Sequence, residues 1–256
     1  MSNLLSSNLN TIAQKYNQII DGDSTDNIIW GTENNDLIYG YTGNDTLHGG
    51  AGNDDLEGGD GNDILYGEDG DDILNGGPGE DTLIGGSGSD ILTGGDYEKD
   101  IYIFQKGHGH DTVNDRGEQT DPNNVIFENA SYSQAKFSRT GVDLIIKAYG
   151  TEDSVTFTNY FAGKLYQNFI FNFTDKTLNF EDINKIDYDR NNNHQKSIIK
   201  GWKGKDILYG SDGEDELYGG DGDDELHGGD GNDELTGGSG YDIVDGGKGM
   251  ILFGMI

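Results

Sequence analysis

The sequence contains no cysteine and only two prolines among its 256 residues. The absence of cysteine excludes disulfides, thiolate catalysis and zinc sites built on thiolates. Basic residues are also scarce: 16 Lys and Arg stand against 48 Asp and Glu, and the formal net charge is −32. Since phosphate contacts need Lys and Arg, this balance argues against nucleic acid as a partner.

Apolar residues make up only 32% of the chain, against a typical share of about 45–50%. No apolar run approaches the ~20 residues of a membrane span, so we expect no transmembrane segment. The first twenty residues lack a basic start followed by an apolar stretch, so no N-terminal signal peptide is expected. Low hydrophobicity combined with high net charge is typical of disordered chains. Disorder is therefore the alternative against which any evidence for a folded structure is weighed.

Glycine, by contrast, is abundant, with 43 residues in the chain. The glycines follow a nine-residue unit, which is clearest in GGAGNDDLE-GGDGNDILY at 49–66 and in GGDGDDELH-GGDGNDELT at 219–236. Glycine occupies the first position of the unit, aspartate the sixth and leucine or isoleucine the eighth. Three columns held in register over many copies cannot result from biased composition, so we predict order over these copies.

The sixth position defines the candidate metal ligands. Asn27 occupies it in the first copy, and aspartate in the later ones. These aspartates are Asp36, Asp45, Asp54, Asp63, Asp72, Asp81, Asp90, Asp206, Asp215, Asp224, Asp233 and Asp242.

The spacing predicts a parallel β-solenoid. Glycine permits the positive φ angles of a tight turn, so six residues form a turn and three form a short strand with the eighth side chain inward. Two units close one coil, so equivalent residues recur every eighteen positions and stack at a strand spacing of about 4.7–4.9 Å. Adjacent copies lie on opposite edges of the coil. Asp54 therefore stacks with Asp36 and Asp72 and not with Asp63.

Stacked carboxylates repel one another unless a cation lies between them. Ca²⁺ takes 6–8 oxygen ligands at about 2.3–2.6 Å, and twice that distance matches the strand spacing, whereas Mg²⁺ is smaller and fits the gap less well. Aspartate also favours turns for its own reasons, but this alternative does not explain one fixed column behind a fixed glycine. We therefore predict calcium between the turns, with glycine-turn carbonyls as further ligands.

The rest of the chain divides by composition. An apolar stripe at Leu5, Leu9, Ile12, Tyr16 and Ile19 predicts an amphipathic helix over 4–19, within an N-terminal segment 1–21. We interpret this helix as a cap on the coil; membrane association is the alternative, which the single lysine of its polar face disfavours.

A first β-roll is expected over 22–104, followed by a central β-domain at 105–186 where glycine becomes rare and β-forming residues are frequent. Strands are predicted there at 124–127, 136–139, 144–147, 155–160 and 169–173, with a hairpin turn at 174–176. A polar linker at 187–200 precedes a second β-roll at 201–256, whose last copy breaks at Met250 and Ile251. The predicted fold class is all-β, with two parallel β-rolls flanking a β-rich centre.

The repeat resembles the glycine-rich nonapeptide repeat of RTX (haemolysin-type calcium-binding) proteins, G-G-x-G-x-D-x-U-x, over about 22–104 and 201–249. The central GVDLIIKAYG, DSVTFTNYF and FIFNFTDKTLNFEDI resemble the β-domain that often follows such repeats, with Asp175-Lys176-Thr177 in place of a usual Asp-Gly-Thr turn. The resemblance implies a β-roll that is disordered at low calcium. It also implies export by a type I system through an uncleaved C-terminal signal, and folding outside the cell.

The resemblance also implies how the ligands combine. It pairs the aspartates as Asp36/Asp54, Asp45/Asp63, Asp54/Asp72, Asp63/Asp81, Asp72/Asp90, Asp206/Asp224, Asp215/Asp233 and Asp224/Asp242. The turn glycines that would contribute carbonyls are Gly50, Gly52, Gly59, Gly61, Gly70, Gly77, Gly79, Gly88, Gly213, Gly220, Gly222, Gly229, Gly231, Gly238 and Gly240. The eight pairs would bind about eight Ca²⁺, whose 16 positive charges equal half of the −32.

The sequence contains no catalytic motif: neither H-E-x-x-H nor G-x-S-x-G is present, so we expect no enzyme. His48 and His227 occupy outward ninth positions, and His194 lies in the polar linker. His108 and His110 are either ligands of a transition metal or variable positions of a degenerate glycine turn, and we favour the turn.

Aromatic residues offer a further possibility. Tyr97, Tyr102, Tyr149, Tyr160 and Phe161 are either a carbohydrate-binding face or packing residues on strands.

The expected function is that of a secreted calcium-binding protein whose repeats fold on calcium and act as a structural or surface-interaction module. Its expected partners are calcium ions, the type I secretion apparatus and cell-surface or glycan targets. The alternatives are a truncated C-terminal part of a larger RTX toxin or secreted hydrolase, and a carbohydrate-binding protein.

Overall fold

The structure is a computed structural model of the chain. It describes residues 15–95, 98–115, 122–140, 142–150, 152–161, 167–184, 198–201, 205–210, 213–249 and 251–253. Most of the predicted N-terminal helix and of the linker lies outside these residues. The chain divides into two compact units: unit 1 comprises 1–136, 146–158 and 168–177, and unit 2 comprises 137–145, 159–167 and 178–256.

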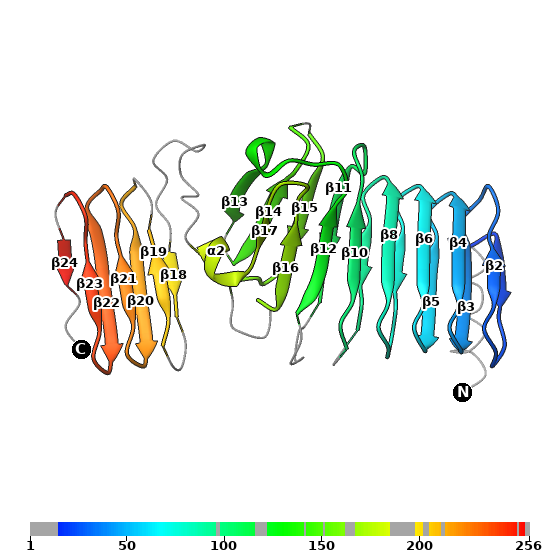
Figure 1. Cartoon of the computed structure of the whole chain (residues 1–256), viewed down its shortest axis with the longest axis horizontal. Helices are drawn as coiled ribbons and strands as arrows, with labels where there is room; N and C mark the ends of the chain where they lie inside the picture. The colour runs from blue at the N-terminus through cyan, green and yellow to red at the C-terminus, as the bar shows by residue number, and fades with distance from the viewer. Residues whose placement is uncertain are drawn as a thin grey trace. The chain divides into compact units, whose positions relative to one another are not determined.

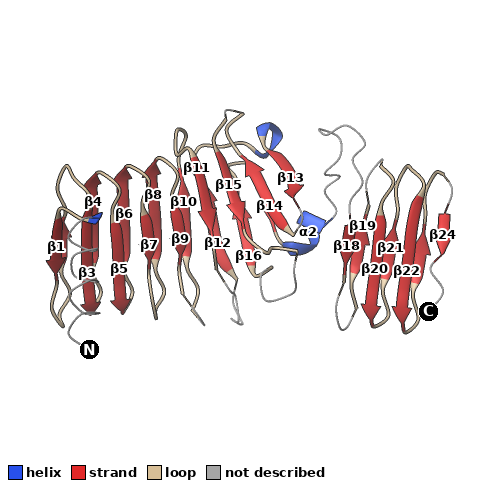
Figure 2. Ribbon diagram, turned by 180° about the vertical axis from the view of Figure 1, so that it is seen from behind, coloured by secondary structure: helices blue, strands red, loops and turns tan. Residues whose placement is uncertain are grey.

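Unit 1 contains two sheets built from alternate repeats, as Figures 1 and 2 show, and the repeat strands in them pair in parallel. The first sheet has, in spatial order, β1 (Gln18–Asp21), β3 (Asp36–Thr42), β5 (Asp55–Asp60), β7 (Ile73–Asn75), β9 (Ile91–Thr93), β11 (His110–Val113), β15 (Ser154–Phe157) and β14 (Asp143–Lys147). The second has β2 (Ile28–Trp30), β4 (Thr46–Ala51), β6 (Ile64–Asp69), β8 (Thr82–Ser87), β10 (Ile101–Phe104), β12 (Asn123–Phe127), β16 (Phe169–Asn172) and β17 (Thr177–Leu178). A short 3₁₀ helix, η1 (Tyr132–Gln134), follows β12.

The pairing register is the predicted eighteen residues. Leu56 pairs with Leu74 in the first sheet, and Leu47 with Leu65 in the second. These eighth-position side chains are fully buried between the two sheets. The coil therefore has a core one side chain deep on each side, since the intervening side chains point outward.

The central segment continues both sheets. β12 pairs in parallel with β10, and β15 in parallel with β11. The core column changes from leucine to larger side chains, because Tyr102 follows Leu83 and Val125 follows Tyr102 in register. The predicted boundary at 104/105 thus marks a change of side-chain chemistry and of turn length, while the parallel pairing goes on.

Aromatic residues fill the core at this level. Phe157 contacts Phe171 across the coil, with ring centroids 5.0 Å apart. Phe104 stacks on Phe127 at 5.6 Å. The predicted hairpin is confirmed: the Phe173 amide donates to the Lys176 carbonyl at 2.8 Å, and β16 and β17 are neighbours.

Unit 2 contains β13 (Lys136–Thr140), α2 (Phe180–Asn184) and the second β-roll. One sheet of this roll has β18 (Ile198–Lys200), β20 (Glu216–Asp221), β22 (Asp233–Ser239) and β24 (Ile251–Phe253), and the other has β19 (Ile207–Tyr209), β21 (Glu225–His227) and β23 (Ile243–Asp245). Its core is the column of Ile199, Leu217, Leu226 and Leu235. The pairings of β20 with β22 and of β21 with β23 have the same eighteen-residue register.

Two predicted boundaries are wrong. Gln18–Asp21 is strand β1, paired with β3, so the predicted helix does not extend to residue 19. Ile198–Lys200 is strand β18, paired with β20, and not part of a linker. The physical reason is the same in both places: Ile20 and Ile199 stand in the eighth position of a copy that lacks glycine in its first half, and they extend the core column by one step.

Among the described residues, no helix has the length and apolar character that crossing a membrane would require.

Candidate metal centre

The sixth-position aspartates of unit 1 lie directly before the strands, where each turn enters the coil. From Asp36 to Asp90 they are at most 2% exposed. Burying a carboxylate is costly unless its charge is paired or coordinated. A column of such side chains therefore requires partners.

In each predicted pair, one oxygen of the second carboxylate has a partner within the column. The Asp36 amide donates to Asp54 Oδ1 at 2.7 Å, and the Asp206 amide to Asp224 Oδ1 at 2.8 Å. All eight predicted pairs have this hydrogen bond, at 2.7–3.0 Å. The structure therefore brings the predicted pairs together, and it places Asp54 and Asp63 in different columns. That these pairs bind metal stays a prediction.

In nine of the described aspartates the other carboxylate oxygen has no such partner. Among the described residues, Oδ2 is buried without a hydrogen-bond partner in these aspartates: Asp45, Asp54, Asp63, Asp72, Asp81, Asp90, Asp100, Asp224 and Asp233. Buried carboxylate oxygens without a partner are rare in folded proteins. A recurring row of them indicates a ligand that protein atoms do not replace.

The first-position glycine leaves open space next to this oxygen. A methyl group on Gly58 would lie 2.4 Å from Asp63 Oδ2 and 2.6 Å from the carbonyl oxygen of Gly76, one coil further. Gly67 has the same surroundings, with Asp72 Oδ2 at 2.4 Å and the Gly85 carbonyl oxygen at 2.3 Å. A carboxylate oxygen and a carbonyl oxygen thus share one space, and such oxygens are the ligands that Ca²⁺ takes.

This first-position carbonyl is a candidate ligand that the sequence-based set lacks. The signal was present, because the first position is glycine in nearly every copy. The structure shows that this glycine does not need a positive φ, whereas Gly59 and Gly61 have φ of 108° and 140°. The first position is glycine for space, and the second and fourth are glycine for backbone conformation.

The predicted second- and fourth-position carbonyls face the next coil. The Gly61 carbonyl oxygen lies 1.7 Å from where a methyl group on Gly79 would be, and the Gly59 carbonyl lies 2.5 Å from that position on Gly77. Their role as calcium ligands stays a prediction. Among the described residues, no group of three or more His, Cys, Asp or Glu side chains has an arrangement that could hold a metal ion by itself. Paired carboxylates supplemented by carbonyls are therefore the ligand set available.

Burial perturbs the acidity of the column. It raises the pKa of Asp54 and Asp63 to about 6, although the amide that each accepts lowers the pKa in part. The same cause raises the pKa of Asp72 and Asp81 to about 7, and that of Asp90 to about 8. The charge of a neighbouring aspartate in the column adds to each shift. Carboxylates that are hard to ionise in the cation-free coil become strong ligands for a cation that neutralises them.

A second polar column was missed. The fifth-position side chains accept from the coil that follows: Asn35 Oδ1 accepts the Asn53 amide at 2.8 Å, and Asn44 Oδ1 accepts the Asn62 amide at 2.8 Å. Asn35 is partly exposed and Asn44 is exposed, and both satisfy amides of the turn. The preference for Asn and Asp at the fifth position of the repeat was the available signal.

The histidines separate. His48 and His227 lie on the outer faces, as predicted, and pair with Glu68 at 2.9 Å and with Glu225 at 3.0 Å. His108 is buried against Asp111, whereas His110 is exposed and contacts Ser154. His108 and His110 therefore do not converge on one metal. His194 lies outside the described residues.

Two of the five aromatic residues proposed as a carbohydrate-binding face are core residues. Tyr102 and Tyr160 are fully buried, Tyr149 and Phe161 are partly buried, and Tyr97 lies outside the described residues. Tyrosines packed in a core cannot present their rings to a carbohydrate. Packing is the correct reading of Tyr102 and Tyr160.

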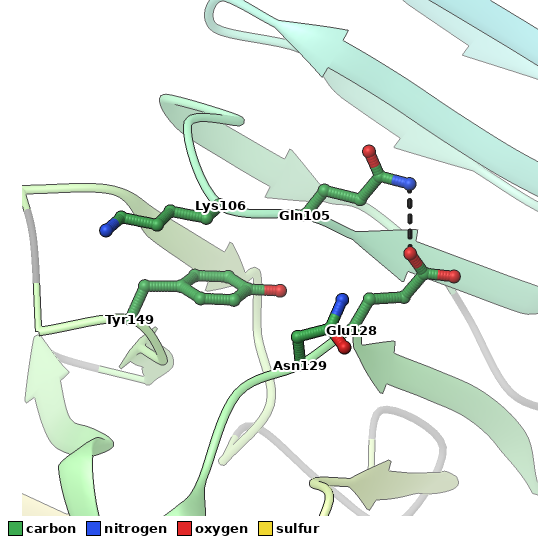
Figure 3. A pocket seen from close by; sticks show the side chains of 5 residues that line it. All are labelled: Gln105, Lys106, Glu128, Asn129 and Tyr149. Atoms are coloured by element: carbon green, nitrogen blue, oxygen red, sulfur yellow. Dashed lines mark hydrogen bonds between the residues drawn. The ribbon is translucent and has the colours of Figure 1, made fainter.

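A pocket of about 330 Å³ opens beside Tyr149, lined also by Gln105, Lys106, Glu128 and Asn129 (Figure 3). Gln105 Nε2 donates to Glu128 Oε2 at 3.0 Å, and the Tyr149 hydroxyl donates to the Phe104 carbonyl at 2.6 Å. These five lining residues include no nucleophile next to a base. The pocket is separate from the aspartate columns.

Comparison with known proteins identifies the same repeats that form the aspartate columns. The family model of the RTX calcium-binding nonapeptide repeat matches residues 21–56, 48–83, 75–96, 201–235 and 218–249. These ranges leave the central segment unmatched. No curated protein matches the chain.

Among solved structures, the extracellular lipase LipA from Serratia marcescens is similar, at 17% identity and a TM-score of 0.24. The match covers 54% of this chain and 37% of that chain. The chain thus corresponds to little more than a third of the lipase's length. The repeat matches and the coil itself lead to one conclusion: the chain carries two blocks of repeats that match the RTX calcium-binding nonapeptide repeat.

Proposed function

We propose that this protein is a secreted, non-enzymatic calcium-binding protein whose two β-rolls fold when calcium binds between stacked turns. The observation that carries the proposal is the row of buried, unpartnered Oδ2 atoms, which from Asp45 to Asp81 each lie next to a carbonyl of the following coil. Bound calcium supplies the positive charge and the demand for 6–8 oxygens that such a row lacks.

The leucine and aspartate columns of the coil have different effects on folding. The leucine column buries apolar surface only when coils stack, because each coil contributes one side chain per sheet. Stacking in turn brings the carboxylates together, and their burial opposes it at neutral pH. A chain of this charge therefore stays unfolded until its carboxylates are neutralised.

Export in the unfolded state fits this coupling. Low calcium inside a cell keeps the repeats open for a type I apparatus, and higher calcium outside folds them. An extracellular location is thus part of the proposal and rests on the RTX repeats.

Far-UV circular dichroism of the full chain tests the coupling. We expect little β signal in EDTA, a strong β signal in millimolar calcium, and reversal when EDTA is added again. Magnesium at the same concentration is the matched control and should leave the spectrum near that of the EDTA sample. A spectrum indifferent to calcium would contradict the proposal.

One observation favours a surface-binding role in addition. Trp30, His48 and Tyr66 stack along the outer face of the second sheet, with ring centroids 3.6 and 4.7 Å apart. Trp30 is 63% exposed at the end of this stack. Screening the calcium-loaded protein and its Trp30→Ala variant on a glycan panel tests it, and binding that the variant retains in full would argue against this surface.

A further inference from the structure

The aspartate column of the second sheet continues beyond the recognised repeats. In the first block of repeats, the family match ends at residue 96. Asp100 lies just beyond this end, after an insertion of one residue. Even so, the Asp81 amide donates to Asp100 Oδ1 at 3.0 Å across a separation of 19 residues. Asp100 is 1% exposed, and its Oδ2 has no hydrogen-bond partner among the described residues.

The space next to this pair matches that of the preceding pairs in the same column. A methyl group on Gly76 would lie 2.3 Å from Asp81 Oδ2 and 2.7 Å from the Gly94 carbonyl oxygen. The same two kinds of oxygen surround Gly58, at 2.4 and 2.6 Å. The Asp81/Asp100 step therefore has the same oxygen set as the Asp63/Asp81 step.

The column of the first sheet ends differently. The Asp90 amide donates to Asp111 Oδ1 at 3.1 Å, so Asp111 also continues the stack. Its Oδ2, however, is bonded to Nδ1 of the buried His108 at 2.7 Å. The three atoms nearest to a methyl group on Gly85 all belong to Asp90, with no carbonyl of the next coil among them.

The column of the second sheet also stops after Asp100. The next member is Asn123, whose Oδ1 accepts the Asp100 amide at 2.8 Å. The Asn123 Nδ2 donates to Asp115 Oδ2 at 2.7 Å, so the amide presents a nitrogen where an aspartate would present its second oxygen.

We propose that Asp81 and Asp100 form an additional calcium site outside the recognised repeats, and that Asp90 and Asp111 do not, because His108 replaces the cation at Asp111. This inference rests on the proposed calcium function of the columns. It adds one site to the eight that the sequence predicts and assigns His108 as the residue that ends the first column.

Counting bound calcium tests it with two matched variants of the full chain. Asp100→Asn and Asp111→Asn each keep Oδ1, and with it the hydrogen bond from the preceding coil. We expect Asp100→Asn to bind one calcium fewer than the unmodified protein, and Asp111→Asn to bind the same number, measured by equilibrium dialysis with elemental analysis.

The outcomes separate cleanly. An unchanged count in Asp100→Asn overturns the additional site, and a loss of one ion in Asp111→Asn overturns the role of His108. An unmodified chain that binds no calcium would instead refute the proposed function itself. If Asp100→Asn does not refold in calcium, anomalous scattering from calcium-grown crystals of the unmodified chain decides. We expect a cation peak between Asp81 and Asp100 and none between Asp90 and Asp111, and the absence of the first peak would overturn the proposal.

Discussion

At the scale of single residues, the sixth-position aspartates from Asp45 to Asp81 use their two oxygens differently. Oδ1 accepts the amide of the preceding coil and fixes the stacking, as in the 2.7 Å bond from Asp45 to Asp63. Oδ2 faces the first-position glycine and the carbonyl beyond it. One side chain thus sets the register of the coil and also supplies the oxygen offered to a cation.

The raised acidities predict how pH acts. In the cation-free coil the pKa of Asp54 is about 6 and that of Asp90 about 8, against 3.8 for an unperturbed aspartate. A raised pKa in the folded state contributes stability that is fully present below the unfolded value and is lost as the pH rises through the folded value. In EDTA, β structure should therefore increase as the pH falls from about 8.5 to about 5.5.

In calcium the direction reverses, because protons compete for the same oxygens. The calcium concentration at the folding midpoint should rise by roughly tenfold or more over the same fall in pH. Circular dichroism titrations at each pH measure both effects. A midpoint that does not depend on pH would show that these carboxylates are not the ligands.

The first-position glycine predicts a steric effect. Gly58→Ala places a methyl group against Asp63 Oδ2 and the Gly76 carbonyl, which should destabilise the calcium-loaded coil by about 1–3 kcal/mol. Asp60→Ala, in the same repeat, removes an exposed carboxylate and should change stability by no more than about 0.5 kcal/mol. Urea unfolding in excess calcium measures both. Equal effects of the two changes would contradict the assigned space.

At the scale of elements, the alternation along each strand predicts which side chains matter. On β6, Leu65 is fully buried and the neighbouring Ile64 is 36% exposed. Leu65→Ala should cost about 2–5 kcal/mol, because the single-layer core leaves a cavity that the stacked coils cannot close. Ile64→Ala should cost about 0.5 kcal/mol or less.

Urea unfolding of both variants in calcium tests this contrast. Similar losses from Leu65→Ala and Ile64→Ala would mean that the strand lies in another register, since a slip by one residue exchanges the two faces.

The repeats themselves could be predicted from the sequence because glycine, aspartate and leucine each have a physical reason to recur every nine residues. Strands β1 and β18 could not be predicted from the repeat pattern, since Ile20 and Ile199 continue the core column without a glycine turn before them. The central strands were predicted one by one, but not their parallel pairing. Insertions lengthen the coil there, with separations of 19, 21 and 23 residues at successive aspartate-column contacts, so the periodicity is lost although the stacking persists.

The additional site shows the same limit. Asp100 is outside the nine-residue frame by one residue, so spacing alone does not place it in the column. His108 could be recognised as part of a degenerate turn, but only the structure brings its Nδ1 within 2.7 Å of Asp111 Oδ2. Which residues of successive coils come into contact depends on the lengths of all the turns between them. A local sequence motif does not give these lengths.

At the scale of the whole molecule, charge and core are coupled. The chain has a formal charge of −32, and its repeat cores consist of single columns of leucine, isoleucine and valine. Burial of so thin a core does not outweigh that repulsion unless cations neutralise the carboxylates. The repeat blocks of units 1 and 2 both carry aspartate pairs of this kind, so we expect both to fold only in calcium.

Amide hydrogen exchange read residue by residue tests this claim most directly. The amides of Asp54 and Asp224 donate to carboxylates of the next coil and report the columns of the two blocks. We expect strong protection of both in millimolar calcium, and exchange at the rate of an unfolded chain in EDTA or in magnesium. Equal protection with and without calcium would contradict it.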